Sequence, residues 1–170
     1  MLKAIKNFFS RNSMNSKLPK MSFPSYFFIR SDEASLEAAV DQIYNTKKFC
    51  RWVNFFPFAW AHFDQEYADV GCTGRFYFFA TPFRYKVEFI DVIPNKRYKA
   101  AVSGLIKGEI SGNFIQIENG VLFEHLFTFT AANWLVHAYY NLTVKPPHLP
   151  YMAWRYMIFK KNAIKDTQKN

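Results

Sequence analysis

Residues 146–170, PPHLPYMAWRYMIFKKNAIKDTQKN, predict a long C-terminal helix whose first half is apolar on every side. Between Tyr151 and Phe159 the only charged residue is Arg155. A helix that is apolar all round has to be covered by other parts of the protein. We therefore expect this helix to pack against a large sheet.

Prolines set the predicted start of this helix. Pro146 and Pro147 are expected to exclude helix upstream, whereas Pro150 fits the first helical position, which tolerates a missing N–H group. The C-terminal half is rich in cations, which suit the negative end of the helix dipole: Lys160, Lys161 and Lys165. The predicted helix thus begins near Pro150, is covered over its first half and runs into solvent at its end.

The composition indicates a single domain with a large apolar interior. The chain has 170 residues, of which 50% are hydrophobic and 20% aromatic, with 20 Phe and 10 Tyr. A chain of this length buries about two thirds of the surface that its unfolded form exposes. Its aromatic content exceeds the needs of an ordinary core and suggests a second apolar space, such as a ligand cavity. No apolar run approaches the roughly 18–20 residues of a membrane-spanning helix.

The net charge of +9 is concentrated at the two ends of the chain. Residues 1–20 carry five basic side chains and no acid, residues 155–170 carry five basic and one acidic, and residues 21–154 carry twelve of each sign. Nucleic acid binding needs a basic stripe across one face, which a neutral folded body does not provide. We therefore expect no nucleic acid partner.

Residues 1–20 form a basic extension, and residues 21–170 form the domain. Leu2, Ile5 and Phe9 share one helical face, which predicts a short amphipathic helix followed by a Ser- and Asn-rich linker. Three roles stay open: a loosely docked tail, a targeting presequence, or contact with an anionic membrane through Lys3, Lys6 and Arg11. The expected location is the cytoplasm, with or without membrane association, or an organelle reached by a mitochondrial-type presequence.

The domain is expected to begin with one strand and two short helices. Residues 22–30 form the strand, which Pro24 places at a sheet edge because proline cannot donate a ladder hydrogen bond. The sequence 31-SDE-33 is expected to cap a helix that continues to about Asn45. A second, shorter helix spans residues 47–53.

Six further strands are indicated by alternating apolar and polar residues. Short connections require antiparallel neighbours, among them the turns Thr81-Pro82 and Lys107-Gly108 and the hairpin sequence Asn119-Gly120. The predicted strands cover residues 58–66, 74–80, 83–92, 97–105, 109–118 and 121–130. Together with the first strand they form one sheet with a dry face and a wet face. Residues 132–142 fit a strand or a short helix, and helix is favoured because one side carries Leu135, Tyr139 and Leu142.

Several spaced features carry a resemblance to a known superfamily. They are 28-FIRSDEA-34, Trp52, Gly71 and Gly74, 87-VEFIDVIPNKR-97, residues 108–112, the Asn119-Gly120 hairpin and 159-FKKN-162. With this order of elements, residues 22–165 resemble the START-like or SRPBCC superfamily, and within it the polyketide cyclase-like branch. One feature departs from that branch, because many of its members carry a His after the Asn of the last helix, and here Ala163 follows Asn162.

The resemblance implies an α+β fold of helix-grip (Bet v 1-like) type. A curved seven-stranded antiparallel sheet would wrap around the long C-terminal helix, with two short helices between the first two strands. It also implies an apolar cavity between sheet and helix that holds a lipid, sterol, polyketide or other hydrophobic small molecule.

The predicted ligand pocket consists of the side chains that strands and helix would direct inward: Trp60, His62, Tyr77, Tyr85, Phe89, His125, Phe127, Trp154 and Ile158. Of these, His62 and His125 are candidates for general acid/base catalysis or for anchoring a ligand carbonyl. Asp64 would share the strand face of His62 and could pair with it. The alternative for His125 is a neutral core histidine bonded to a backbone or tyrosine group.

The sequence contains no nucleotide, phosphate or zinc motif, and Cys50 and Cys72 match no metal or redox spacing. We expect no cofactor and no metal. The expected function is binding, transport or sequestration of a hydrophobic small molecule or lipid. The alternatives are a polyketide cyclase or dehydratase that uses His62 or His125, and a protein-interaction or assembly module with exposed aromatic residues.

Overall fold

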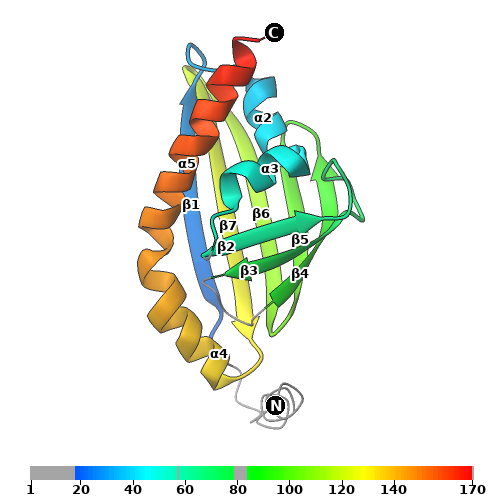
Figure 1. Ribbon diagram of the computed structural model, residues 1–170, viewed down its shortest axis with the longest axis vertical. Helices are drawn as coiled ribbons and strands as arrows, with labels where there is room; N and C mark the ends of the chain where they lie inside the picture. The colour runs from blue at the N-terminus through cyan, green and yellow to red at the C-terminus, as the bar shows by residue number, and fades with distance from the viewer. Residues whose placement is uncertain (1–17, 57, 79–83, 170) are drawn as a thin grey trace.

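The computed structural model describes residues 18–56, 58–78 and 84–169 (Figure 1). One antiparallel sheet has the strand order β1-β7-β6-β5-β4-β3-β2. Its strands are β1 Met21–Arg30, β2 Ala59–Phe63, β3 Thr73–Phe78, β4 Arg84–Ile93, β5 Arg97–Gly104, β6 Ile106–Ile117 and β7 Gly120–Ala131. The helices are α2 Leu36–Tyr44, α3 Thr46–Val53, α4 Trp134–Tyr139, the π-helix η1 Tyr140–Val144 and α5 Lys145–Thr167.

The sheet is curved, and α2, α3 and α5 lie on the same side of it (Figure 1). The long α5 runs beside β1 and also contacts α2 and α3. The interior of the protein therefore lies between the concave face of the sheet and these three helices. This arrangement confirms the predicted α+β architecture, with a long C-terminal helix and two short helices between the first two strands.

Alternation along the strands selects the core side chains, as predicted. In β4, Tyr85, Val87 and Phe89 are buried, whereas the residues between them are exposed. In β5 and β7 the residues between the buried ones are exposed or half-buried, and the buried side chains include Tyr98, Ala100, Val102, Phe123, Phe127 and Phe129. The first strand lies at the edge of the sheet and pairs with β7, which agrees with the position predicted from Pro24.

The connection between β5 and β6 differs from the predicted Lys107-Gly108 turn. Gly104 provides the turn with a φ of +128°, a conformation that favours glycine. Gly108 lies within β6 opposite Phe129, where a Cβ atom would come 2.0 Å from the carbonyl oxygen of Thr128. Glycine is thus needed at position 108 because the backbone of β7 is too close for a side chain. Strand β6 begins at Ile106, before the predicted residue 109.

The predicted cap of the first helix is wrong. The N-cap of α2 is Ser35, whose hydroxyl accepts a hydrogen bond from the Ala38 N–H group at 3.1 Å. Residues 31–33 instead form the turn after β1, where Ser31 donates its N–H to the Asn119 carbonyl at 2.9 Å. Backbone pairing with the neighbouring hairpin thus determines the conformation of this acidic sequence.

The predicted start of the last helix is also wrong. Helical structure enters α5 from η1, and Pro146 and Pro147 lie in the first turn of α5, where N–H groups need no partner within the helix. Pro150 lies inside α5 rather than at its start. The prolines therefore allow a helix that begins at Lys145.

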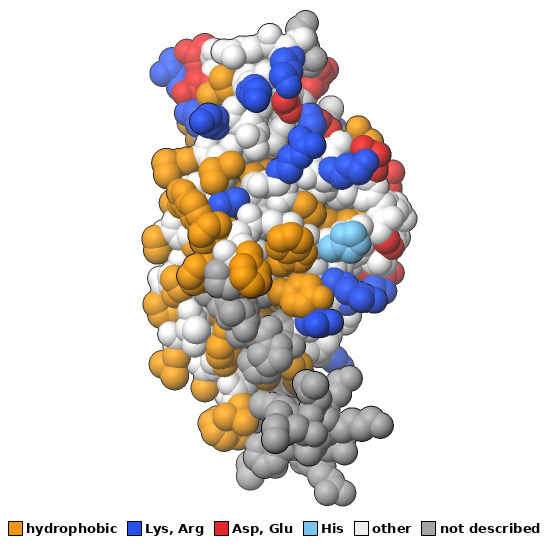
Figure 2. Space-filling view, viewed as in Figure 1, with side chains coloured by type: hydrophobic (Ala, Val, Ile, Leu, Met, Phe, Trp, Pro, Cys, Tyr) orange, Lys and Arg blue, Asp and Glu red, His pale blue; other side chains and the backbone are white. Residues whose placement is uncertain are grey.

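Helix α5 is covered on one side only, contrary to the expectation that its apolar half is enclosed. Tyr156 and Phe159 are buried, whereas Leu149 and Met157 are 63% and 64% exposed. Hydrophobic side chains accordingly gather on the outer surface over α5 (Figure 2). The one charged residue of the apolar stretch, Arg155, points inward and is 4% exposed. Between Tyr151 and Phe159 the one charge therefore lies inside, whereas apolar side chains lie on both the inner and the outer side of the helix.

The ambiguous segment 132–142 is helical from Trp134, as favoured. The buried residues of α4 and η1 are Val136, Tyr140 and Val144. They lie on a different side from Leu135, Tyr139 and Leu142, and Leu142 is 79% exposed. Helical spacing was correct, but the choice of side depends on the contacts of α4 with β7.

Some predictions fall on residues outside the described ranges. Residues 1–17, and with them Lys3, Lys6 and Arg11, lie outside, as does the predicted turn Thr81-Pro82. Among the described helices, none combines the length and apolar character that crossing a membrane requires. Cys50 and Cys72 are both free thiols.

Charged contacts fasten the C-terminal half of α5 to α2 and α3. The Lys48 ammonium lies 2.7 Å from the Asp166 carboxylate, which also accepts a hydrogen bond from the Gln42 amide at 2.9 Å. Lys160 donates to Glu33 at 2.6 Å. The hydrogen bond from Lys48 lowers the pKa of Asp166 below its ordinary value.

We predict that Asp166→Asn lowers the free energy of unfolding by about 1–2 kcal/mol at pH 7, because the charged hydrogen bonds are lost. The folded-state pKa of Asp166 is lowered, so its contribution is complete above the ordinary value of about 3.9 and disappears as the pH falls through the folded pKa. Denaturant unfolding of wild type and variant at pH 7 and below pH 4 measures this. Asp69→Asn, on an exposed loop, is the control, and a difference that is independent of pH would contradict the assignment.

Candidate functional site

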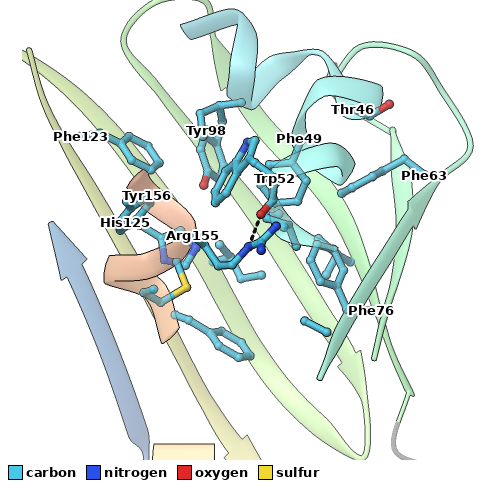
Figure 3. A pocket seen from close by; sticks show the side chains of 18 of the residues that line it. Thr46, Phe49, Trp52, Phe63, Phe76, Tyr98, Phe123, His125, Arg155 and Tyr156 are labelled. Atoms are coloured by element: carbon cyan, nitrogen blue, oxygen red, sulfur yellow. Dashed lines mark hydrogen bonds between the residues drawn. The ribbon is translucent and has the colours of Figure 1, made fainter. Parts of the chain in front are cut away.

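An apolar cavity of about 80 Å³ lies between the concave face of the sheet and helices α3 and α5 (Figure 3). Its walls come from elements that are far apart in the sequence. The lining includes Phe49, Trp52 and Val53 of α3, Tyr85, Val87 and Phe89 of β4, Tyr98 and Ala100 of β5, Phe123, His125 and Phe127 of β7, and His148, Tyr151, Met152, Arg155 and Tyr156 of α5. The space has room for several water molecules.

Four of the predicted pocket residues line this cavity: Tyr85, Phe89, His125 and Phe127. They project from β4 and β7, where every second residue faces the interior. Ile158 does not line the cavity; it is half-buried and packs against the hydrophobic core. The period-two pattern of the sequence therefore predicts the cavity-lining side chains of β4 and β7 correctly.

The predicted inward side of β2 is wrong. Ala59 and Ala61 face inward, while Trp60 is 50% exposed and His62 is exposed on the other side of the strand. The small alanines are inside because α3 packs there, and the Asn54 side chain bonds both the N–H and the carbonyl of Ala61.

Two more predicted residues lie outside the cavity. Tyr77 pairs with Trp60 across β2 and β3, so it shares the outer side, and its ring lies 4.8 Å from the Arg84 guanidinium. Trp154 lies on the outer side of α5 with 37% of its surface exposed.

The suggested pair of His62 and Asp64 does not assemble. Both carboxylate oxygens of Asp64 accept hydrogen bonds from Thr73, one from the backbone N–H at 2.8 Å and one from the hydroxyl at 2.7 Å. The bond from the Thr73 hydroxyl lowers the pKa of Asp64. This carboxylate therefore joins the two ends of the connection between β2 and β3.

His125 belongs to a hydrogen-bonded chain at the wall of the cavity. Its Nδ1 atom lies 3.3 Å from the Ser25 hydroxyl, which in turn lies 3.0 Å from the Tyr156 hydroxyl. Ser25 and His125 are directly opposite each other in the β1–β7 ladder. The ring keeps some accessible surface although it lies deep in the protein, because it faces the cavity. His125 is thus linked to the Tyr156 hydroxyl through the Ser25 hydroxyl, whereas the alternative interpretation had a direct bond to a tyrosine or to the backbone.

Both cavity histidines are neutral at pH 7. Burial lowers the pKa of His125 to about 4, with a smaller contribution from nearby His148, and burial lowers the pKa of His148 to about 4. A neutral imidazole can anchor a ligand carbonyl or hydroxyl by a hydrogen bond. Acid/base catalysis by His125 stays a prediction.

The tyrosines at the cavity keep their protons. Burial raises the pKa of Tyr85 and Tyr98 well above the ordinary value, and raises the pKa of Tyr151 to about 12. Their hydroxyls are therefore neutral groups on apolar rings. Within residues 18–56, 58–78 and 84–169, no three His, Cys, Asp or Glu side chains form a group able to hold a metal.

Arg155 is the charged residue among the lining side chains that our list of predicted pocket residues did not contain. Its side chain is directed toward the cavity, and its Nε atom donates to the Trp52 carbonyl (Figure 3). Nη2 donates to the Asn54 carbonyl at 3.3 Å. The sequence did contain a signal, since Arg155 is the one charge in a nine-residue apolar stretch, Tyr151 to Phe159. What the sequence lacked was the direction in which that charge points.

Comparison with solved structures identifies the fold. Norcoclaurine synthase from Thalictrum flavum, in complex with dopamine and hydroxybenzaldehyde, matches with a TM-score of 0.60 and 14% identity over 88% of this chain and 89% of that one. A protein from Staphylococcus epidermidis, solved by NMR, gives 0.57 and 13% over 91% and 94%. The chain has the helix-grip fold.

A further helix-grip structure is the di-domain ARO/CYC protein StfQ from the steffimycin biosynthetic pathway. It matches with a TM-score of 0.59 and 10% identity over 91% of this chain and 54% of StfQ. The polyketide cyclase-like resemblance is thus supported at the level of fold. No family model matches the sequence, and the search of curated proteins gives no significant match.

We predict that NMR titration of the histidine rings gives midpoints near pH 4 for His125 and His148, instead of the ordinary value of about 6.5. Because the unfolded chain binds these protons first, stability should fall as the pH drops from about 6.5 towards 4. His125→Asn and His148→Asn assign the signals. Midpoints at the ordinary value would contradict the burial of neutral rings.

Proposed function

We propose that this protein binds a hydrophobic small molecule in the cavity between its sheet and α5. The observation that carries the proposal is unfilled apolar space enclosed by aromatic rings from α3, β4, β5 and β7. Interiors are normally packed to crystal-like density, so space of this size lowers stability. A bound molecule restores the missing contacts.

The size of the cavity limits the ligand. About 80 Å³ is less than the ~300–1,000 Å³ of typical ligand pockets, so a single ring or a short chain fits better than a large lipid. A longer ligand requires side chains such as Met152 to move, and Met152 is half-buried and has several rotatable bonds. A precedent for single-ring ligands in this fold is norcoclaurine synthase, in its complex with dopamine and hydroxybenzaldehyde.

Polar groups at the cavity give the ligand an orientation. His125 and Tyr156 offer neutral hydrogen-bonding atoms on one wall, and Tyr98 offers a hydroxyl from β5. A mostly apolar pocket with a few fixed polar groups is typical of small-molecule sites. This arrangement supports recognition of a molecule that is apolar over most of its surface.

We predict that the purified native protein retains a small organic molecule, released by organic solvent and seen as added mass in native mass spectrometry. Ala100 is 1% exposed and lines the cavity, so Ala100→Leu fills the space and should weaken binding about tenfold or more. Ala101→Leu, on the opposite face of the same strand, should leave binding unchanged.

The outcome that would contradict the function has two parts. The native mass would equal that of the bare chain, and no member of a library of single-ring and short-chain compounds would raise the melting temperature of wild type more than that of Ala100→Leu. Circular dichroism of both variants checks that they are folded.

A further inference from the structure

Arg155 is a cation in the wall of an otherwise neutral cavity. It is 4% exposed, and at pH 7 it is the only charged side chain among the described residues that line the cavity, since His125 and His148 are neutral. Burial lowers the pKa of the guanidinium, but an arginine keeps its proton in proteins. A full positive charge therefore lies at the wall of the proposed ligand site.

No carboxylate of the chain neutralises this charge. All 13 Asp and Glu residues lie in the described ranges, and none comes within 4.0 Å of Arg155. Buried cations are normally paired, because removing a charge from water without a partner is costly. Because no carboxylate of the chain pairs with Arg155, a carboxylate of a bound ligand can do so.

The contacts of Arg155 hold it in place without cancelling its charge. Nε and Nη2 donate to the carbonyls of Trp52 and Asn54 at the end of α3, where the helix dipole is negative. The guanidinium carbon lies 4.6 Å from the ring centre of Trp154 and 5.8 Å from that of Phe55. Such cation–π contacts favour a cation but contribute only part of a counter-charge.

Donors remain available for a ligand. A guanidinium has five N–H groups, and the two backbone bonds leave Nη1 without a hydrogen bond to any described residue. Figure 3 shows the guanidinium between Trp52 and the ring cluster of the cavity, fixed from the α3 side. The group is thus preorganised, with its position set before a ligand arrives.

We propose that the cavity recognises an amphipathic monoanion, an apolar body that carries one carboxylate, and that Arg155 binds the carboxylate. This inference rests on the proposed ligand-binding function and specifies its ligand class. A single cation in an apolar space matches a single negative charge, whereas a doubly charged phosphate would leave one charge buried without a partner. Charge-assisted hydrogen bonds from arginine to a carboxylate are among the strongest available in proteins.

The test compares acids with their neutral amides. Calorimetry or ligand-detected NMR measures the affinities of benzoate and benzamide, and of octanoate and octanamide, for the full-length chain. Wild type should bind at least one acid about tenfold or more tightly than its amide. The two pairs distinguish an aromatic body from an aliphatic one, and phenyl phosphate should bind more weakly than benzoate.

Variants separate anion binding from a structural role. Arg155→Met keeps the apolar stem and should abolish the preference for the acid while the amide still binds. Arg155→Lys keeps a charge and should retain part of the preference. Lys161→Met makes the same change in net charge on the exposed side of α5 and should change nothing. If Arg155 served only to join α5 to α3, Arg155→Met would lower the melting temperature and leave the acid-to-amide ratio unchanged.

Two failures are distinguishable. If wild type binds amides and acids equally, the anion inference is overturned and the hydrophobic-ligand function stands. If neither class binds, the anion inference is overturned, and the proposed function fails as well when the native mass equals that of the bare chain and no library compound raises the melting temperature. Should Arg155→Met not fold, the wild-type acid-to-amide ratio and Arg155→Lys still decide the question.

Discussion

The packing of α5 on the concave face of the sheet is the contact on which the rest of the structure depends. Between ring centroids, Phe27 of β1 lies 4.8 Å from Tyr156 and 4.9 Å from Phe159, and Trp52 of α3 lies 5.3 Å from Phe159. One side of α5 therefore contacts a strand and a helix at the same time. Without this helix the cavity would lose a wall, and its rings would be exposed to water.

The cavity and the buried charge have a common origin in how α5 is oriented. Tyr156 and Arg155 from its inner side and the small Ala59 and Ala100 of the sheet line the same cavity, where aromatic rings surround space that no side chain fills. Its outer side presents apolar groups such as Met157. An ordinary amphipathic helix directs its charges to solvent, whereas here one cation faces inward, and on our proposal it gives the cavity an electrostatic preference as well as an apolar lining.

Much of the fold could be predicted because its signals are local. Alternation along β4 and β7, and the Asn119-Gly120 hairpin, require only neighbouring residues. The side chains that line the site could not be predicted from local patterns alone. On β2 both faces contain apolar residues, so only packing against α3 places Ala61 inside and Trp60 outside. On α5 an apolar stretch without a polar side gives no information about which side is buried, and the direction of Arg155 is set by carbonyls distant in sequence.

The claim at the centre of this account is that unfilled apolar space exists beneath α5. Xenon binds in apolar protein cavities, so crystals pressurised with the gas test this claim most directly. The account predicts xenon density between Phe127, Tyr98 and Met152 in wild type, and its loss in a variant with a larger residue at position 100. A cavity region filled by protein side chains, with no xenon density in wild type, would contradict the account.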